Sequence, residues 1–269
     1  MGSPVLPGFE LTLVIDLITQ FFFLSLRVGA FLLAGPGFGG RFVPLPVRIV
    51  ATMVITLPLL GQVPTPTVAE LSQLSAVLLI VNELVIGLTG GLMLAILFGA
   101  AALAGDRIAN TAGLGFAAQM DPSAGAQTPV VAQIFGLFLL VIFVSIDGHL
   151  MAFRIILDSY TFLPAGQMAN PAALIAGGLT AGGRMFALGI KIMLPVVATL
   201  LLINMMVGVF TRSAPQLNVF SFGFPITIGA TIVLLYLTVP NTGDVFELLI
   251  SDALDLLGDT LKDAAYGGE

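Results

Sequence analysis

Long apolar runs separated by short polar breaks dominate this chain. A run of about 20 apolar residues can cross a bilayer as a helix, and clusters of Pro and Gly, such as Gly35-Pro36-Gly37, are strong helix breakers. The pattern predicts an all-α polytopic membrane protein of long kinked helices and helical hairpins, with a kink at Pro195. The expected apolar helices cover about residues 11–34, 47–60, 68–104, 129–162, 171–210 and 226–239.

The end of the chain has a different pattern. Pro240 should stop the preceding apolar run, and residues 244–262 then alternate between apolar and acidic positions at helical spacing. This predicts an amphipathic C-terminal helix. We expect this helix to dock on a neighbouring subunit; the alternative is a solvated tail. The apolar face consists of Leu249, Ala253, Leu256, Leu257 and Leu261, and the acidic positions are Asp244, Glu247, Asp252, Asp255 and Asp259.

Composition supports a membrane location and excludes several kinds of partner. The 269 residues are 58% hydrophobic and only 9% charged, whereas soluble domains carry about 25% charged residues. The net charge of −6 is concentrated near the C-terminus, which argues against a nucleic-acid partner. There is no cysteine and a single histidine, so Cys-based or His-cluster metal sites are excluded. No pattern typical of a cleaved signal peptide is present.

Residues 101–125 interrupt the apolar pattern with small residues and glycines. Too many glycines are present for a good helix, and irregular backbone is not tolerated facing lipid because its polar groups lack hydrogen bonds there. Two interpretations remain open. The segment is an ordinary loop between two membrane helices, or it is a re-entrant loop that occludes a pore.

Charged residues inside the apolar runs are costly in lipid and imply shielding by protein. For Glu83, we expect a salt bridge to an arginine of this chain or of a neighbour; the alternative is a proton or ion site. Arg154 and Asp158 have the i, i+4 spacing of a structural pair. Gly87, Gly90 and Gly91 predict close packing of the 68–104 helix against protein. The charges concerned are Arg27, Arg48, Arg154, Arg184, Lys191, Asp16, Glu83, Asp147 and Asp158.

Enzyme chemistry finds no support in the sequence. His149 and Asp147 are two residues apart, which on a helix directs them apart. Gly105-Asp106 has no matching second aspartate motif for a shared carboxylate site, and no phosphate-binding loop is present. We therefore expect a protein that is not an enzyme and needs no cofactor.

Four segments carry a resemblance to the FliR family of type III secretion export-gate proteins. The second and fourth together are specific, and the similarity extends over essentially the whole length. At Asp147 the family usually has Asn. The segments are 27–48 (RVGAFLLAGPGFGGRFVPLPVR), 113–122 (GLGFAAQMDP), 143–151 (FVSIDGHLM) and 212–228 (RSAPQLNVFSFGFPITI).

The resemblance implies a subunit of the flagellar protein export gate, in the bacterial inner membrane at the flagellar basal body. With FliP-like and FliQ-like subunits it would form a channel for unfolded flagellar proteins, beside an FlhB-like switch protein and an FlhA-like export component. Residues 1–175, including the segment 105–125, would resemble FliP, and residues 176–269 the FliQ helical hairpin. The alternatives are an ion-coupled secondary transporter using Glu83 or Asp106, without visible internal repeats, and a virulence injectisome gate subunit, which the 113–122 block matches less closely.

The resemblance also implies roles for individual residues. The central segment would plug the closed pore, with Phe116 and Met120 as the occluding side chains. Gly105, Gly113 and Gly125 would serve as hinges. The plug comprises Leu114, Gly115, Phe116, Ala117, Ala118, Gln119, Met120, Asp121 and Pro122. The subunit-interface candidates are Arg48, Glu83, Arg212, Pro215, Gln216, Phe220 and Phe224.

Overall fold

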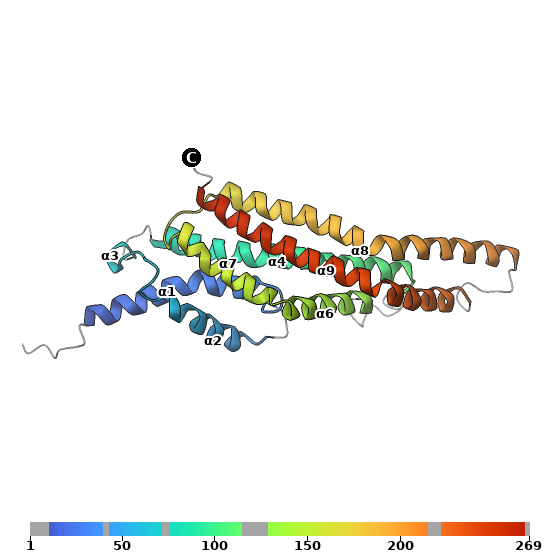
Figure 1. Cartoon of the computed structure of the whole chain (residues 1–269), viewed down its shortest axis with the longest axis horizontal. Coiled ribbons are helices and arrows are strands. Elements are labelled where there is room, and N and C mark those ends of the chain that lie inside the picture. The colour runs from blue at the N-terminus through green and yellow to red at the C-terminus, as the bar shows by residue number, and fades with distance from the viewer. Residues whose placement is uncertain (1–10, 40–42, 72–75, 115–128, 215–221, 267–269) are drawn as a thin grey trace, which may run out of the picture. The chain divides into compact units, whose positions relative to one another are not determined.

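The described part of the chain is all-α, as predicted. A computed structural model describes residues 11–39, 43–71, 76–114, 129–214 and 222–266. Figure 1 shows the helices in chain order. They are α1 (Leu11–Ala34), α2 (Leu45–Thr56) with a 3₁₀ turn η1 (Leu57–Leu59), α3 (Val68–Leu71), α4 (Ala76–Thr111), α6 (Val130–Ser145), α7 (Gly148–Phe162), α8 (Pro171–Ser213) and α9 (Phe224–Tyr266).

Four of the described helices are long and apolar enough to cross a membrane, and α6 with α7 counts as a fifth candidate if the pair forms one broken span. The four are α1 from Leu13, α4, α8 and α9. The predicted polytopic membrane protein is therefore confirmed.

The chain divides into two compact units. Unit 1 contains Met1–Ala95, Leu150–Leu179 and Leu254–Glu269, and unit 2 contains Ile96–His149 and Thr180–Ala253. The long helices α4, α8 and α9 each contribute residues to both units. The predicted division near residue 175 concerns likeness to other subunits and stays a prediction.

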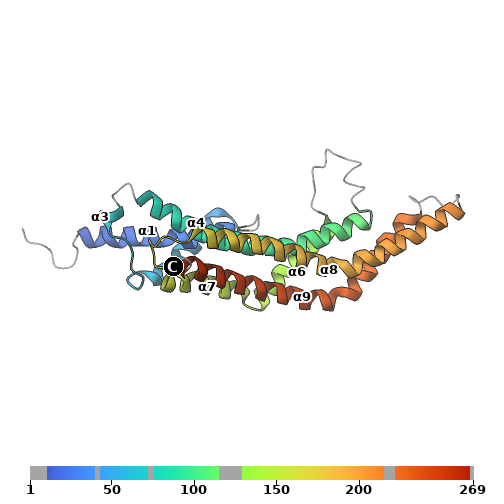
Figure 2. The same cartoon turned by 90° about the horizontal axis from the view of Figure 1, so that it is seen from above.

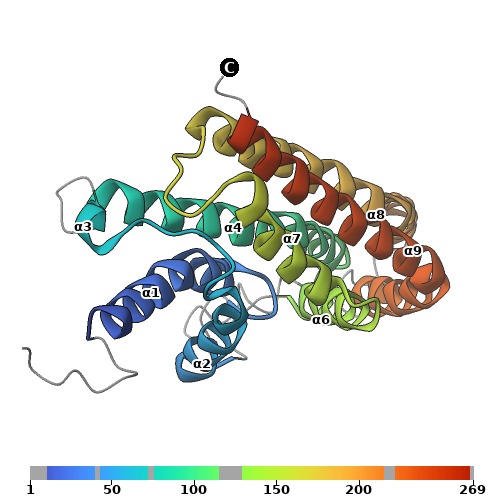
Figure 3. The same cartoon turned by 60° about the vertical axis from the view of Figure 1, so that its left-hand side comes forward.

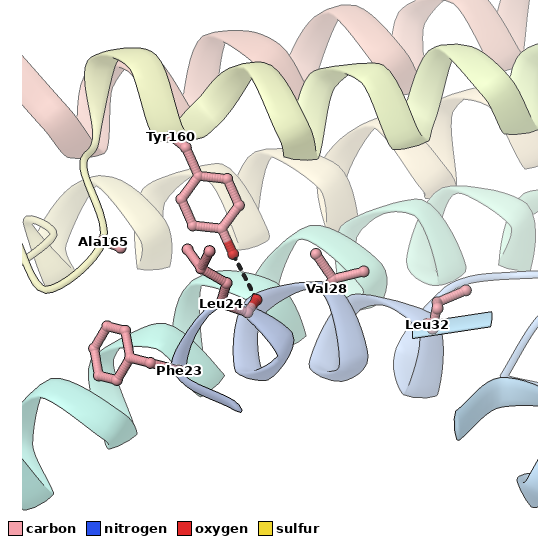
Figure 4. Close-up of a cluster of buried hydrophobic side chains, with 6 residues drawn as sticks. All are labelled: Phe23, Leu24, Val28, Leu32, Tyr160 and Ala165. Atoms are coloured by element: carbon pink, nitrogen blue, oxygen red, sulfur yellow. Dashed lines mark hydrogen bonds between the residues drawn. The ribbon is translucent and has the colours of Figure 1, made fainter. Parts of the chain in front are cut away.

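The core of unit 1 forms where α1 meets α7. Phe23, Leu24, Val28 and Leu32 from one face of α1 are buried together with Tyr160 and Ala165 (Figure 4). The Tyr160 hydroxyl donates a 2.9 Å hydrogen bond to the backbone oxygen of Leu24, so this buried polar group is satisfied. Helix α2 packs beside α1 (Figure 3), where Gly29 faces the Thr52 side chain.

Glycines bring α1 and α4 into close contact within unit 1. A Cβ atom at Gly87 would overlap the backbone oxygen of Arg27, and one at Gly91 would come within 2.7 Å of the Phe31 backbone oxygen. Backbones can approach this closely only where one helix has no side chain. The predicted tight packing of this helix is thereby confirmed.

The amphipathic pattern near the C-terminus is confirmed, but its expected partner is not. All five apolar positions named above are buried within the chain. In unit 1, Leu257 lies against Gly90, Thr260 lies against Gly177, and the Asn170 N–H donates to the Ala264 backbone oxygen at 2.8 Å. Helical spacing identifies an apolar face without specifying what covers it. The chain itself therefore covers this apolar face, and docking of the helix on a neighbouring subunit stays a prediction.

Two helices extend further than the sequence suggested. Pro240 does not end a helix, because α9 continues through it as one element of 43 residues. A proline removes one backbone hydrogen bond, and within a long packed helix the other bonds maintain the element. Likewise α4 continues past residue 104 to Thr111. Gly105 fits there because a Cβ would overlap the backbone of Ala132 on α6. Residues 101–111 are therefore helical, contrary to the expectation.

A break divides the helix predicted over residues 129–162. Helix α6 ends at Ser145 and α7 begins at Gly148, with Asp147 between them at φ +57°. Among the described residues Asp147 is the only non-glycine with positive φ. Asp and Asn tolerate this left-handed conformation better than other side chains. An aspartate at position 147 therefore suits the break.

Candidate functional site: the C-terminal end of α4

The end of α4 precedes the predicted plug and has a well-defined stop. The N–H of Gly113 donates to the Asn110 oxygen at 3.1 Å, and the N–H of Leu114 donates to the Ala109 oxygen at 3.0 Å. Gly113 has φ +84°. These two bonds with a left-handed glycine form a Schellman motif, a common helix terminus. The helix therefore stops immediately before the predicted plug.

Two carbonyl groups at this helix end are bonded by side chains from other helices of unit 2. The last carbonyls of a helix have no partner within it. Nδ2 of Asn204, on α8, donates to the Thr111 oxygen at 3.0 Å. Oγ1 of Thr227, on α9, donates to the Ala112 oxygen at 3.2 Å. The terminus of α4 is therefore held by both α8 and α9.

The Phe224 ring lies against Gly113. A Cβ atom at position 113 would lie 2.5 Å from Cε1 of Phe224, closer than any real contact. Only glycine satisfies both the backbone conformation and this contact. Gly113 was predicted as a hinge and Phe224 as an interface residue, and the structure brings the two together.

Unit 2 contains two cavities in this region, and the first adjoins the end of α4. The first is about 620 Å³ and has a mixed lining that includes Arg107, Asn110, Asn204, Phe224 and Thr227. The second is about 440 Å³, lies at the α8–α9 hairpin, and is lined by Ile203, Met206, Val207, Phe210, Thr211, Phe222 and Ile226. Figure 2 shows α8 and α9 side by side in this part of the chain.

In unit 1, Glu83 forms a buried ion pair with Arg27. Nε and Nη2 of Arg27 donate to the two carboxylate oxygens at 2.8 and 3.1 Å, and both side chains are fully buried. Nη1 of Arg27 donates to Oγ of Ser159 at 2.9 Å and to the Leu163 oxygen at 3.0 Å. The Gly166 N–H also donates to Glu83. The expected salt bridge to an arginine of this chain is confirmed.

The ion pair joins α1, α4 and the end of α7. The Arg27 guanidinium also stacks 4.0 Å from the centre of the Tyr160 ring, a favourable cation–π geometry. A buried pair with this many hydrogen bonds is a structural connection. Because Glu83 is enclosed by its own chain, its carboxylate is not presented to a neighbouring subunit.

Outside the candidate spans, Glu70 has a local role. The backbone N–H of Thr67 donates to its carboxylate at 2.7 Å, and the Thr67 hydroxyl donates at 3.0 Å. These bonds, the backbone one first, lower the pKa of the exposed Glu70 carboxyl below its usual value. The Glu70 N–H bonds back to the Thr67 hydroxyl, which completes a capping box. Glu70 therefore caps α3 rather than serving as an acid–base group.

The other predicted site residues have different surroundings. Arg48 donates from Nε and Nη2 to the Val43 oxygen at 3.0 and 2.8 Å and so ties the start of α2 to the preceding segment. Gly105 is enclosed inside α4, Leu114 is partly exposed directly after it, and Arg212 lies in the last turn of α8. Outside the described residues lie Gly115, Phe116, Ala117, Ala118, Gln119, Met120, Asp121, Pro122, Gly125, Pro215, Gln216 and Phe220.

The sequence analysis missed Asn204 and Thr227. Both are polar residues within apolar runs, which was the available signal. Among the described residues no group of three His, Asp or Glu side chains is placed to hold a metal ion. His149 packs edge-on against Phe143, with ring centres 6.4 Å apart.

The four described helices that are long and apolar enough to cross a membrane define the class as a polytopic helical membrane protein. Comparison with known proteins narrows this class. Residues 18–253 match the family described as bacterial export proteins, family 1. The chain belongs to this family, which confirms the resemblance seen in the sequence, and it is an export protein rather than an enzyme.

The chain is similar to several proteins named flagellar biosynthetic protein FliR, among them the following three. The protein from Pectobacterium carotovorum is 35% identical over 92% of this chain and 95% of its own length. That from Escherichia coli K12 is 33% identical over 91% and 94%. That from Bacillus subtilis 168 is 30% identical over 91% and 96%. The likeness therefore extends over nearly the entire length of each relative.

Proposed function

We propose that this chain is a subunit of the flagellar protein export gate in the bacterial inner membrane, at the flagellar basal body. With FliP-like and FliQ-like subunits it forms a channel for unfolded flagellar proteins, and it works with FlhB-like and FlhA-like components. The match of residues 18–253 to the bacterial export family carries the proposal. The flagellar name of the relatives favours the flagellar gate over a virulence injectisome.

The lengths of α8 and α9 support an assembled setting. Each has 43 residues, about 65 Å at 1.5 Å per residue, whereas the hydrocarbon core of a bilayer is about 30 Å thick. Much of each helix must therefore lie outside lipid. Both helices also expose many large apolar side chains, among them Leu179, Met205 and Tyr236. Sister subunits would cover these surfaces, and lipid would cover what remains.

We further propose that residues 114–122 close the resting channel. Phe116 and Met120 supply apolar side chains that narrow the passage, since an apolar constriction blocks ions by dewetting. Flexible methionine contacts suit a stopper that must yield to many different polypeptide sequences. The anchored end of α4 supports this assignment, because a plug needs a fixed attachment. Gly105, Gly113 and Gly125 stay predicted hinges, and Arg48, Arg212, Pro215, Gln216, Phe220 and Phe224 stay interface candidates.

Purification tests the assembly. An affinity-tagged chain extracted in mild detergent should bring down FliP-like and FliQ-like proteins in fixed proportion. If the purified chain alone, reconstituted in vesicles, moved a solute along an ion gradient, the secondary transporter would be the better account. The Glu83 carboxylate is one of the two coupling sites that the transporter would use, and it is already paired with Arg27.

A short deletion tests the plug. Residues 115–120 are removed while Gly113 and Leu114 are kept, because the glycine ends α4. We expect the complex to assemble normally and the membrane to leak ions. Phe116→Ala with Met120→Ala should leak as well, and Gln119→Ala is the matched control that should not. If the deletion complex assembles and the membrane does not leak ions, the plug assignment is wrong.

A further inference from the structure

We propose that Asn204 and Thr227 are positioning residues that hold the end of α4, and so fix the point from which the closing segment leaves the helix. The inference rests on the proposed function, because positioning matters only if residues 114–122 close a channel. It adds that α8 and α9 set the position of the α4 end from which that segment starts. Neither residue belongs to the segment itself.

The first step concerns the hydrogen bonds. The Thr111 and Ala112 oxygens come from the last turn of α4, where intrahelical donors are lacking. Asn204 and Thr227 reach them from α8 and α9, at 3.0 and 3.2 Å. Thr227 is almost fully buried and, like Asn204, lines the cavity of about 620 Å³ beside the helix end. The two side chains therefore fix this helix end in a particular place.

The second step concerns the direction of the chain. Directly after the bonded Thr111 and Ala112 carbonyls, Gly113 adopts a left-handed conformation and turns the backbone. The Phe224 ring packs against this glycine. Phe224 lies one helical turn before Thr227, on the same helix α9. The position of α9 therefore determines where the end of α4 lies, and with it the position of Leu114, which follows directly.

The third step concerns release. The Thr227 hydroxyl also lies 3.1 Å from the Phe224 backbone oxygen. If α9 moves away from α4, this hydroxyl can donate fully to its own helix and remains satisfied. Separation therefore breaks the contact between α4 and α9 without leaving a buried donor unpaired. Such an arrangement suits a contact that is made and broken during export.

The experiment uses the whole export complex in membranes, with a single thiol in this chain. Because the chain has no cysteine, Leu114→Cys places its only thiol directly after the anchored end, and labelling is read on this chain after the subunits are separated on a denaturing gel. The rate of its reaction with a water-soluble maleimide reports how firmly that end is held. Ion leakage of the same membranes reports closure. Recovery of the complex shows that each variant has assembled.

The test variants are Asn204→Leu and Thr227→Val, which keep size and remove the donor. Each should raise the labelling rate of the Leu114→Cys thiol about fivefold, the factor that an ordinary hydrogen bond represents, and should raise ion leakage. Thr227→Ser and Asn204→Gln keep a donor and should stay near the parent values. Thr231→Val is the matched control, since its hydroxyl donates only within α9, to the Thr227 oxygen at 2.7 Å.

Labelling at the parent rate in the Asn204→Leu, Thr227→Val double variant would overturn the positioning role. So would equal effects of Thr227→Val and Thr231→Val, which would indicate a general loss of packing. Faster labelling without leakage, in a complex where deletion of 115–120 does leak, would overturn the link to closure. If membranes with the 115–120 deletion do not leak, the proposed plug is wrong. The labelling rates then still show whether Asn204 and Thr227 hold the end of α4.

Discussion

The Arg27–Glu83 pair should be the most sensitive point of unit 1. Both side chains are fully buried, and the carboxylate accepts bonds from Arg27 and from Gly166. Removing one member of a buried ion pair leaves an uncompensated charge, which costs roughly 3–5 kcal/mol. We therefore expect Glu83→Gln and Arg27→Met each to lower the free energy of unfolding by that amount.

The double variant distinguishes a charge effect from lost packing. With Arg27→Met and Glu83→Gln together, no charge is buried, and the amide oxygen introduced by the second substitution can still accept from Gly166. The Leu163 oxygen and Ser159 lose the bonds from Arg27, at about 1 kcal/mol or somewhat more each. We expect a total loss of roughly 2–4 kcal/mol, less than the sum of the single variants.

The assay is unfolding of the purified chain in mild detergent by increasing SDS, followed by far-ultraviolet circular dichroism. Arg154→Met with Asp158→Asn is the control, because that pair is 3.5 Å apart and its side chains are 83% and 61% exposed. An exposed pair contributes at most about 1 kcal/mol. Strict additivity of the Arg27 and Glu83 variants, or a cost no greater than the control's, would refute a coupled buried pair.

Other substitutions test the helix contacts and the break with the same assay. Gly87→Ala should lower stability by about 1–3 kcal/mol, because its Cβ meets the Arg27 backbone, whereas Gly178→Ala, with open space around it, should be neutral or gain up to about 1 kcal/mol. Equal effects would contradict the close approach. Asp147→Asn should stay within about 0.5 kcal/mol, and Asp147→Val should cost about 1–2 kcal/mol. A harmless valine would mean that the left-handed conformation is not needed.

The helices themselves were largely predictable from the sequence. The expected run of residues 11–34 coincides with α1, because Gly35-Pro36-Gly37 ends it sharply. The break at Asp147 was not found, because apolar residues of the same kind lie on both sides and one φ angle makes the difference. At Pro240 the error was the opposite, because a predicted helix end is absent and α9 continues. A proline inside a long packed helix removes only one hydrogen bond.

The pairing of Glu83 was predictable in kind but not in identity. A carboxylate within an apolar run needs a counter-charge, and several arginines were available. The choice of Arg27, 56 residues away, follows from the packing of α1 on α4. Gly87 and Gly91 permit that packing, but sequence spacing does not reveal which helix fills the space above a glycine.

The anchor was missed for a related reason. Asn204 and Thr227 bond to carbonyls that are free only because α4 ends at Thr111. A helix predicted to stop at residue 104 places its free carbonyls a long way from those partners. An error of a few residues at one helix end therefore concealed the contacts that surround the candidate site.

The most direct test of the export-gate account is photo-crosslinking during arrested export. A photoreactive phenylalanine analogue replaces Phe116 or Met120 in the full complex, and export is stalled with a substrate fused to a stably folded domain. Tyr266, an exposed aromatic residue at the end of α9, is the matched control position. We expect positions 116 and 120 to crosslink to the stalled substrate and position 266 not to do so. Crosslinks at 116 and 120 only to lipid, with the substrate stalled in an intact complex, would contradict a plug within the export passage.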